Sequence, residues 1–184
     1  MCGIVGSYSE QGDGLFLDRL ESIRHRGPDD QIAWQNEIKT VQLGHARLAI
    51  IDLANGAQPM WDETQRYALI FNGEIYNFRE LRTELLGKGF SFQTESDSEV
   101  LLNGYIYWGK DVLRKLRGMF AFGIFDKREN SFFLARDHVG IKPLYYEVAD
   151  KKLLFSSELK ALYLGRKQSP RLDLESLHHY LVFG

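Results

Sequence analysis

Hydrophobic and polar residues alternate in short runs along most of this chain, which is the pattern of half-buried β-strands. Strands are expected where β-branched and aromatic residues gather between turn residues. They span residues 2–8, 32–34, 38–43, 67–71, 119–126, 131–136, 144–147 and 153–157. Helical periodicity is found at 15–23, 76–86, 100–108 and 172–183. Because the helices are clustered and do not alternate regularly with the strands, the pattern favours an α+β fold over a doubly wound parallel sheet.

Composition is that of an ordinary globular protein. Apolar residues make up 44% of the 184 residues, charged residues make up 26%, and the formal net charge is −2. This length favours one domain with a sizeable core, and the small net charge gives no electrostatic argument for nucleic acid as a partner. No apolar run reaches the roughly 18 residues of a membrane span, so no membrane partner is expected.

The chain has a single cysteine, Cys2, directly after Met1. One cysteine excludes an internal disulfide framework and a multi-cysteine zinc site. The histidines lack the spacing of a metal-binding helix, so no metal is expected. The first residues also lack the basic and apolar regions of a signal peptide. A reducing, cytoplasmic location fits these features and would keep an exposed thiol usable.

Removal of Met1, which is common before a small side chain, would make Cys2 the first residue. It would then carry a free α-amine, ordinarily titrating near pH 7.7–8.0, beside a thiol that ordinarily titrates near 8.5. Such an amine can act as the base for its own nucleophilic side chain. Position alone leaves an accidental cysteine on a frayed terminus as an equal alternative.

Acyl transfer by a cysteine needs hydrogen-bond donors for the oxyanion that develops. Asn72 and Gly73 follow the expected strand 67–71. The asparagine amide and the glycine N–H can converge on one oxygen, and glycine permits close approach. An Asn-Gly pair taken by itself is more often simply a turn.

Arg47 is a cation in an otherwise apolar run that continues through residues 48–51. A buried charge needs a partner. An internal salt bridge to Asp52 or Glu74 is one explanation, and a bidentate grip on a substrate carboxylate is the other.

Asp97 stands at the start of the expected helix 100–108. The default explanation is that Ser96 or Asp97 caps this helix. Arg47, Glu74 and Asp97 taken together, however, match a zwitterion, with one cation for an α-carboxylate and two carboxylates for an α-ammonium. An amino acid with a side-chain amide fits such a site.

Eight short motifs occur in order along the chain. They lie at residues 1–6 (MCGIVG), 24–29 (RHRGPD), 44–48 (GHARL), 71–77 (FNGEIYN), 96–99 (SDSE), 118–122 (GMFAF), 135–146 (ARDHVGIKPLYY) and 156–162 (SSELKAL). With a cysteine at position two, this series resembles the glutaminase domain of class II glutamine amidotransferases. Within that class it is most similar to the N-terminal half of the glutamine-hydrolysing asparagine synthetases.

The resemblance implies an N-terminal-nucleophile hydrolase (Ntn) fold, a four-layer αββα sandwich of two antiparallel sheets between helices. It also implies a glutaminase, an amidohydrolase that converts L-glutamine to glutamate and ammonia through a thioester at Cys2. In such enzymes the ammonia normally goes to an ATP-dependent ligase domain that makes asparagine from aspartate.

The resemblance assigns roles to residues by position. The implied catalytic residues are the nucleophile Cys2, with its own amine as base, and the oxyanion hole of Asn72 and Gly73. The implied substrate-binding residues are Arg47 for the α-carboxylate, Glu74 and Asp97 for the α-ammonium, and the pocket lining Leu48, Ala49, Ile50, Ile51, Asn72 and Gly73. The loop at residues 26–29 would lie near the site, without an assigned role.

Residues 1–170 are expected to form the glutaminase domain, and residues 171–184 the first helix of a following, absent synthetase domain. The Ser-Gly-Gly-x-Asp-Ser pyrophosphate loop of that domain does not occur here. No cofactor is therefore expected in this domain, because ATP and Mg belong to the missing one. The expected partners are L-glutamine, the C-terminal synthetase domain and, as an open option, a second copy in a homodimer.

Two alternatives remain at this stage. The first is the glutaminase half of another amidotransferase, for sugar or secondary-metabolite amidation. The second is a catalytically silent regulatory domain, which retention of Met1 would favour because Cys2 would then lack its base.

Overall fold

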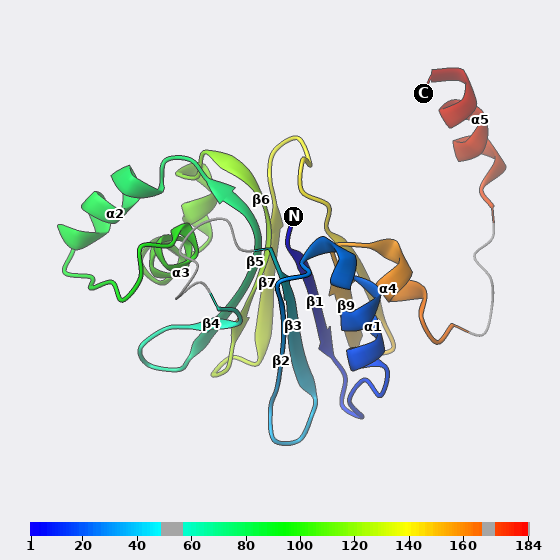
Figure 1. Ribbon diagram of the computed structural model, residues 1–184, viewed down its shortest axis with the longest axis horizontal. Helices are drawn as coiled ribbons and strands as arrows, with labels where there is room; N and C mark the ends of the chain where they lie inside the picture. The colour runs from blue at the N-terminus through cyan, green and yellow to red at the C-terminus, as the bar shows by residue number, and fades with distance from the viewer. Residues whose placement is uncertain (49–56, 167–171, 184) are drawn as a thin grey trace.

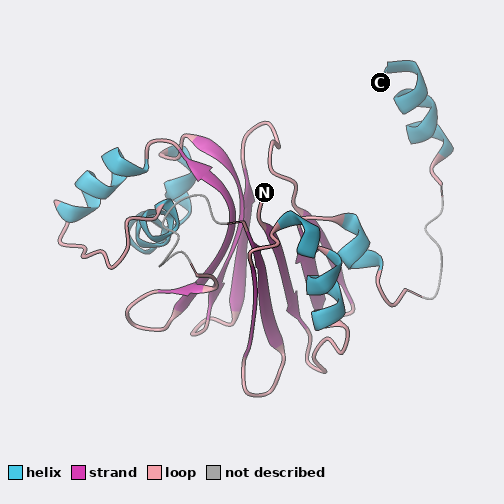
Figure 2. Ribbon diagram, in the orientation of Figure 1, coloured by secondary structure: helices cyan, strands magenta, loops and turns pink. Residues whose placement is uncertain are grey.

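The fold is described from a computed structural model, which covers residues 1–48, 57–166 and 172–183. In these ranges the strands form two antiparallel sheets (Figures 1 and 2). Sheet A has the order β2-β3-β1-β9-β8, with bounds β1 Gly3–Tyr8, β2 Asp30–Gln35, β3 Val41–Arg47, β8 Tyr145–Ala149 and β9 Lys152–Ser156. Sheet B has the order β4-β5-β6-β7, with bounds β4 Met60–Trp61, β5 Tyr67–Ile75, β6 Gly118–Asp126 and β7 Ser131–Arg136.

Helices cover the outer face of each sheet, as Figure 2 shows. On sheet A lie α1 (Phe16–Ser22), the 3-10 turn η1 (Arg24–Arg26) and α4 (Leu159–Tyr163). On sheet B lie α2 (Phe78–Leu86), α3 (Asp97–Trp108) and the 3-10 turn η2 (Gly109–Arg114). The expected four-layer αββα sandwich is therefore confirmed.

Three hydrophobic clusters fill the spaces between the four layers, which is where this fold buries its apolar surface. The cluster between sheet A and its helices includes Val5, Phe16 and Ala161. The cluster between sheet B and α2 and α3 is the largest, and Leu69 and Leu101 belong to it. The cluster between the two sheets is Ile4, Val41, Leu43, Ala68, Ile70, Phe125 and Phe155, and we call it the inter-sheet layer.

Helix α3 begins where the sequence places a cap. Ser96 is the N-cap residue, and its Oγ accepts a hydrogen bond from the Glu99 backbone N–H at 3.2 Å. The Glu99 carboxylate turns back and accepts from the backbone N–H groups of Gln93 and Thr94, both at 2.7 Å. The expected capping role of Ser96 is confirmed, and it sets the position of Asp97 in the first helical turn.

Two strands differ from the sequence expectation for reasons that the structure shows. β5 was expected to end at Phe71 but runs on to Ile75, because residues 72–75 pair with the first residues of β6. The expected strand 38–43 begins only at Val41, since Lys39 has a positive φ of 57° in the turn that joins β2 to β3. The short elements β4, α4, η1 and η2 were not expected at all.

Helix α5 (Leu174–Phe183) stands away from the sandwich in Figure 1. None of its residues is buried, and several large apolar side chains are exposed, with Phe183 at 79%. None of the helices in the described part of the chain combines the length and apolar character of a membrane span.

Candidate active site around Cys2

The alternation of side chains along the strands brings the polar residues of the candidate site to one place. In β3, Val41 and Leu43 belong to the inter-sheet layer, and the two-residue period of a strand carries this face on to His45 and Arg47. In β5, Ala68 and Ile70 belong to the same layer, and the same period carries it on to Asn72 and Glu74.

β1 completes this arrangement. Ile4 lies in the inter-sheet layer, so Cys2 has the inward-facing parity just before the strand begins. Gly3 pairs with Ala46 of β3, which places Cys2 beside the end of that strand. β1 and β3 also both contact β5 across the interface between the sheets. The inner faces therefore change from apolar to polar at the edge where Cys2 lies.

The thiol of Cys2 is held by the backbone that follows β3. Its Sγ lies 3.4 Å from the carbonyl oxygen of Leu48 and 3.4 Å from the Leu48 backbone nitrogen. The residue is half-buried. Leu48, one of the predicted lining residues, is thus in contact with the thiol of Cys2. The other predicted lining residues of this segment, Ala49, Ile50 and Ile51, lie outside the described residues.

The loop with the Arg-His-Arg-Gly motif anchors the main chain of Cys2. Arg26 Nε donates to the Cys2 carbonyl oxygen at 3.0 Å, and Arg26 Nη1 donates to Glu158 Oε1 at 3.0 Å. His25 and Lys160 contact the same carboxylate at 2.8 and 3.2 Å. Burial alone would raise the pKa of Glu158, but hydrogen bonds from these three side chains outweigh it and hold the pKa below its usual range.

A glycine lets this loop approach the sheet. A Cβ at Gly27 would lie 2.3 Å from the carbonyl carbon and oxygen of Ala46 and 2.4 Å from the Arg47 nitrogen. No side chain fits in that space. The motif therefore supplies a close backbone approach and a guanidinium aimed at Cys2. Sequence reasoning placed the loop near the site but could not assign this anchoring contact.

Asn72 is a buried amide at a strand position where packing would favour an apolar side chain. It is 1% exposed, and its Nδ2 has no hydrogen-bond partner among the described residues. The next residue must be glycine, because a Cβ at Gly73 would lie 2.3 Å from the Met119 carbonyl oxygen. An unsatisfied buried donor is costly to leave in a protein interior, and it is often retained for function.

The carboxylate of Asp97 lies at the end of β5 near Glu74. Its Oδ2 accepts a hydrogen bond from the Ile75 backbone N–H at 2.9 Å. Asp97 is 5% exposed. Burial raises the pKa of this carboxyl, the backbone hydrogen bonds partly oppose the rise, and the nearby charge of Glu74 adds to it. Two carboxyl groups that disfavour each other's charge make a place where a cation is stabilised.

His45 is a buried ionisable residue that the sequence did not single out. It is 1% exposed, and neither ring nitrogen has a hydrogen-bond partner among the described residues. Burial lowers its pKa to about 4, although the nearby backbone of Phe71 acts in the opposite direction. His45 is therefore a neutral residue near neutral pH, on the strand face that it shares with Leu43 and Arg47.

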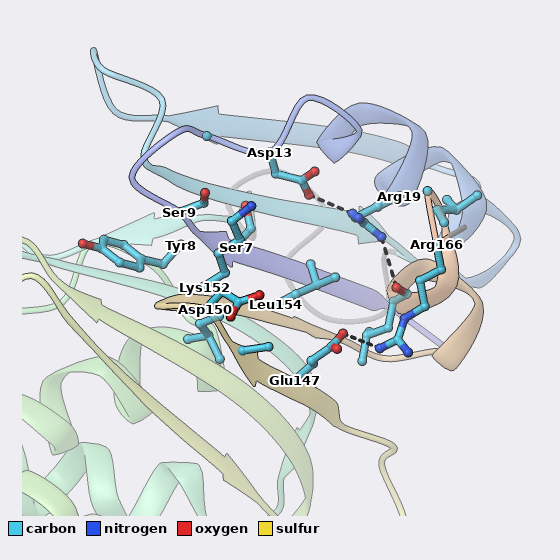
Figure 3. Close-up of a pocket in the computed structure, with 16 residues that line it drawn as sticks. Ser7, Tyr8, Ser9, Asp13, Arg19, Glu147, Asp150, Lys152, Leu154 and Arg166 are labelled. Atoms are coloured by element: carbon cyan, nitrogen blue, oxygen red, sulfur yellow. Dashed lines mark hydrogen bonds and ion pairs between the residues drawn. The ribbon is translucent and has the colours of Figure 1, made fainter. Parts of the chain in front are cut away.

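A separate pocket of about 270 Å³ lies between sheet A and the ends of α1 and α4 (Figure 3). Four of its charged side chains form ion pairs, Asp13 with Arg19 at 2.7 Å and Glu147 with Arg166 at 2.5 Å. None of the predicted site residues lines it. Within the ranges that the structure describes, no group of His, Cys, Asp or Glu side chains is placed to hold a metal ion.

With this geometry in place, a family model for a glutamine amidotransferase domain matches residues 1–184. The chain belongs to this family. The amidotransferase resemblance expected from the eight motifs is confirmed, and so is the expectation of an enzyme.

Curated relatives carry the same domain in longer proteins. Glutamine-hydrolysing asparagine synthetase 1 of Bacillus subtilis is 43% identical over 190 residues and matches the whole of this chain. Asparagine synthetase B of Escherichia coli is 40% identical over 170 residues and matches 88% of it. The chain spans about 30% of the length of each relative. The amidotransferase domain is therefore of the type that glutamine-hydrolysing asparagine synthetases contain.

Solved amidotransferase structures share the fold. Glutamine phosphoribosylpyrophosphate amidotransferase from B. subtilis, complexed with ADP and GMP, matches with a TM-score of 0.74 and 25% sequence identity over 88% of this chain and 43% of its own. An allosteric regulatory enzyme of purine biosynthesis matches over the same shares with a TM-score of 0.70. These neighbours confirm the predicted Ntn hydrolase fold.

Proposed function

We propose that Cys2, freed by removal of Met1, hydrolyses L-glutamine to glutamate and ammonia through a thioester. The observation that carries the proposal is the unpartnered Nδ2 of Asn72, buried on the inner face that continues toward Cys2. A buried donor without a partner lowers the stability of the folded protein. Its presence is explained if it donates a hydrogen bond to an oxyanion during the reaction.

Substrate recognition follows from the charges at the polar edge of the inter-sheet layer. Arg47 is the cation that the inward face of β3 presents beside Cys2, and it binds the α-carboxylate of glutamine. Glu74 and Asp97 bind the α-ammonium group. The raised pKa of Asp97 supports this role, since a bound cation would offset both the burial of the carboxylate and its repulsion by Glu74, which raise it.

The reaction begins when Sγ of Cys2 attacks the side-chain amide carbon of glutamine and the thiol proton passes to the α-amine of Cys2. A C–S bond forms, and the carbonyl electron pair moves to the oxygen, which Asn72 Nδ2 and the Gly73 N–H stabilise. When the C–N bond breaks, the α-ammonium gives its proton to the departing nitrogen and ammonia leaves. Water then attacks the thioester by the same steps, glutamate is released and the free thiol of Cys2 is regenerated.

The test is glutamate release from L-glutamine by the purified chain whose loss of Met1 has been confirmed by intact mass. Cys2→Ala is the control, because alanine fits the same space and lacks the nucleophile. Hydroxylamine added to the reaction should yield γ-glutamyl hydroxamate, because it intercepts a thioester. Glutamate release by Cys2→Ala, or the absence of hydroxamate from an active wild-type chain, would contradict the mechanism.

The fate of the ammonia is a further part of the proposal. The relatives are named asparagine synthetases, which supports the proposal that the ammonia is used to convert aspartate to asparagine in a synthetase domain of the full-length protein. The exposed apolar side chains of α5 suit packing against such a domain. Glutamine-dependent asparagine formation by the full-length protein, with ATP and aspartate supplied, tests this assignment. A different amidated product would support another amidotransferase parent.

A further inference from the structure

A buried lysine faces the residue that must be removed to activate Cys2. Lys142 is 4% exposed, and its Nζ lies 3.0 Å from the Sδ of Met1. Lysine is rarely buried to this extent without a charged partner. Sequence reasoning recognised Lys142 only as part of a motif and gave it no role.

The connection between β7 and β8 is built so that this lysine points inward. The carboxylate of Asp137 accepts from the backbone N–H groups of Phe120, Ile141 and Lys142, at 3.2, 2.8 and 2.9 Å. Arg136 Nε donates to the Lys142 carbonyl oxygen at 2.8 Å. The acceptors of Asp137 are thereby used by the backbone, and the turn is fixed beside the Gly73 end of β5, which pairs with Phe120.

The Lys142 ammonium has no carboxylate at ion-pair distance in the described part of the chain, and Met1 Sδ is a weak acceptor. Removal of Met1 takes this contact away and creates an amine at Cys2, one residue from the methionine that Lys142 touched. A positive charge disfavours the protonation of a nearby amine.

We propose that Lys142 is a positioning residue that acts through the α-amine of Cys2: once Met1 is removed, its ammonium keeps that amine uncharged and able to accept the thiol proton. The proposal rests on the glutaminase function proposed above, because only that chemistry needs a free amine. It goes beyond it by assigning the 135–146 motif to preparation of the base.

Other charged groups act on the same amine and must be held constant. Arg26, bonded to the Cys2 carbonyl, is a second cation on the side of η1. The other elements around the site contribute four carboxylates: Glu158 before α4, Glu74 on β5, Asp97 on α3 and Asp137 after β7. Arg47 lies at the end of β3 beside Cys2. A variant of Lys142 alone leaves all of these in place.

The single cysteine makes a direct test possible. Protein labelled with ¹³C-cysteine gives signals from Cys2 alone, and the Cα shift of the processed chain reports protonation of its α-amine. In Lys142→Met, we expect the amine titration to move to higher pH, because the positive charge that disfavours protonation of the amine is removed. Lys142→Arg keeps the charge and should titrate as the wild type does.

The matched control is Lys127→Met, which removes one exposed lysine after the opposite end of β6 and gives the same net charge. Equal titrations in Lys142→Met and Lys127→Met would overturn the proposal. If Lys142→Met does not fold, the wild type alone decides. Its Cys2 amine must titrate at lower pH in the folded protein than in urea, and an equal or higher value would overturn the proposal.

This measurement needs no turnover of glutamine, so it is independent of the proposed activity. Loss of the glutaminase function would show itself as an absence of Cys2-dependent glutamate release. Where release occurs, the acid limb of kcat/KM should move to higher pH in Lys142→Met and stay in place in Lys142→Arg. If Lys142 had only a structural role, Lys142→Met would lower activity at all pH values without moving this limb.

Discussion

At the scale of single residues, the proposed chemistry depends most on the buried amide nitrogen of Asn72. Its neighbours Ile70 and Phe71 are packed in hydrophobic clusters, whereas Asn72 buries an amide donor that has no partner in the described residues. Such a position lowers stability in the resting protein. It becomes favourable only when an acceptor arrives, which is the condition that a transition-state oxyanion meets.

Asn72→Ala should therefore reduce kcat much more than it changes KM. We expect a fall in kcat of about 10²–10³-fold, the usual effect of losing one oxyanion donor. The folded state should lose little stability, since the substitution removes a buried Nδ2 donor that has no partner in the described residues. Steady-state kinetics and urea unfolding check both parts. A variant with wild-type kcat would show that Asn72 does not serve the oxyanion.

Asp97→Asn should mainly weaken glutamine binding. The asparagine oxygen can still accept from the Ile75 N–H, so the fold is kept while the charge opposite the α-ammonium is lost. We expect KM to rise by at least about tenfold, since a hydrogen bond to a charged group contributes about 1.5–3 kcal/mol. Glu99→Gln is the acidic control, because Glu99 serves the start of α3. An unchanged KM would argue against Asp97 as an ammonium ligand.

The same carboxyl predicts how binding varies with pH. Its pKa is raised in the folded protein, so it takes up a proton at a higher pH than an ordinary aspartate does. KM for glutamine should rise as the pH falls through this raised pKa. In Asp97→Asn this dependence should be absent. A KM profile that is equally steep in both proteins would assign the titration to another group.

At the scale of elements, the local patterns predicted most strands and helices but not where β5 ends. The composition of residues 72–74 predicts the end of a strand. They nevertheless continue β5, because they pair with Ala121, Phe120 and Met119 of β6. Such pairing joins residues far apart in sequence, so no local window contains it. β4 and α4 were missed for a related reason, because two and five residues are too short to show a period.

The start of α3 was predictable because its signal is local. Ser96→Ala should lower the free energy of unfolding by about 1 kcal/mol, since the Glu99 N–H would lose its acceptor. The exposed Ser131 of β7 provides a control in Ser131→Ala. Urea unfolding of the two variants tests this. Equal stability of both would mean that Glu99 and water supply the cap without the serine.

At the scale of the whole molecule, the sequence predicted the sandwich through its family likeness. The site residues remain predictions, made from their chemistry and from the same likeness. The sequence could not predict what joins them. Arg26 contacts Cys2, which is 24 positions away in the sequence. Glu158, which is 132 positions from Arg26, accepts a second hydrogen bond from its guanidinium. These are consequences of how the layers are stacked, and so is the burial of His45.

Global stability should depend on pH through His45. Its pKa is near 6.5 when the chain is unfolded and about 4 when folded, so between these values the unfolded state binds a proton that the folded state does not. The free energy of unfolding should therefore fall as the pH drops from about 6.5 to about 4, by about 3 kcal/mol in all. Urea unfolding across this window should show a shallower fall in His45→Gln. Identical slopes would exclude His45 as the source.

Helix α5 should contribute nothing to the stability of the sandwich. Truncation after Arg166 removes a helix with no buried residue, so we expect the same urea midpoint and m-value as for the intact chain. The shorter chain should also self-associate less, because the exposed apolar side chains are gone. Light scattering checks this part. A lower urea midpoint would show that α5 packs on the sandwich after all.

The change from apolar to polar along the inner strand faces has a consequence for mutational tolerance. Volume changes at Val41, Leu43 or Ile70 alter packing far from the nucleophile, and in a deep mutational scan they should reduce protein abundance. Changes at Arg47 or Asn72, further along the same faces, should leave abundance intact and abolish turnover. Along the same strand faces, position thus separates the residues that determine protein abundance from those expected to determine turnover.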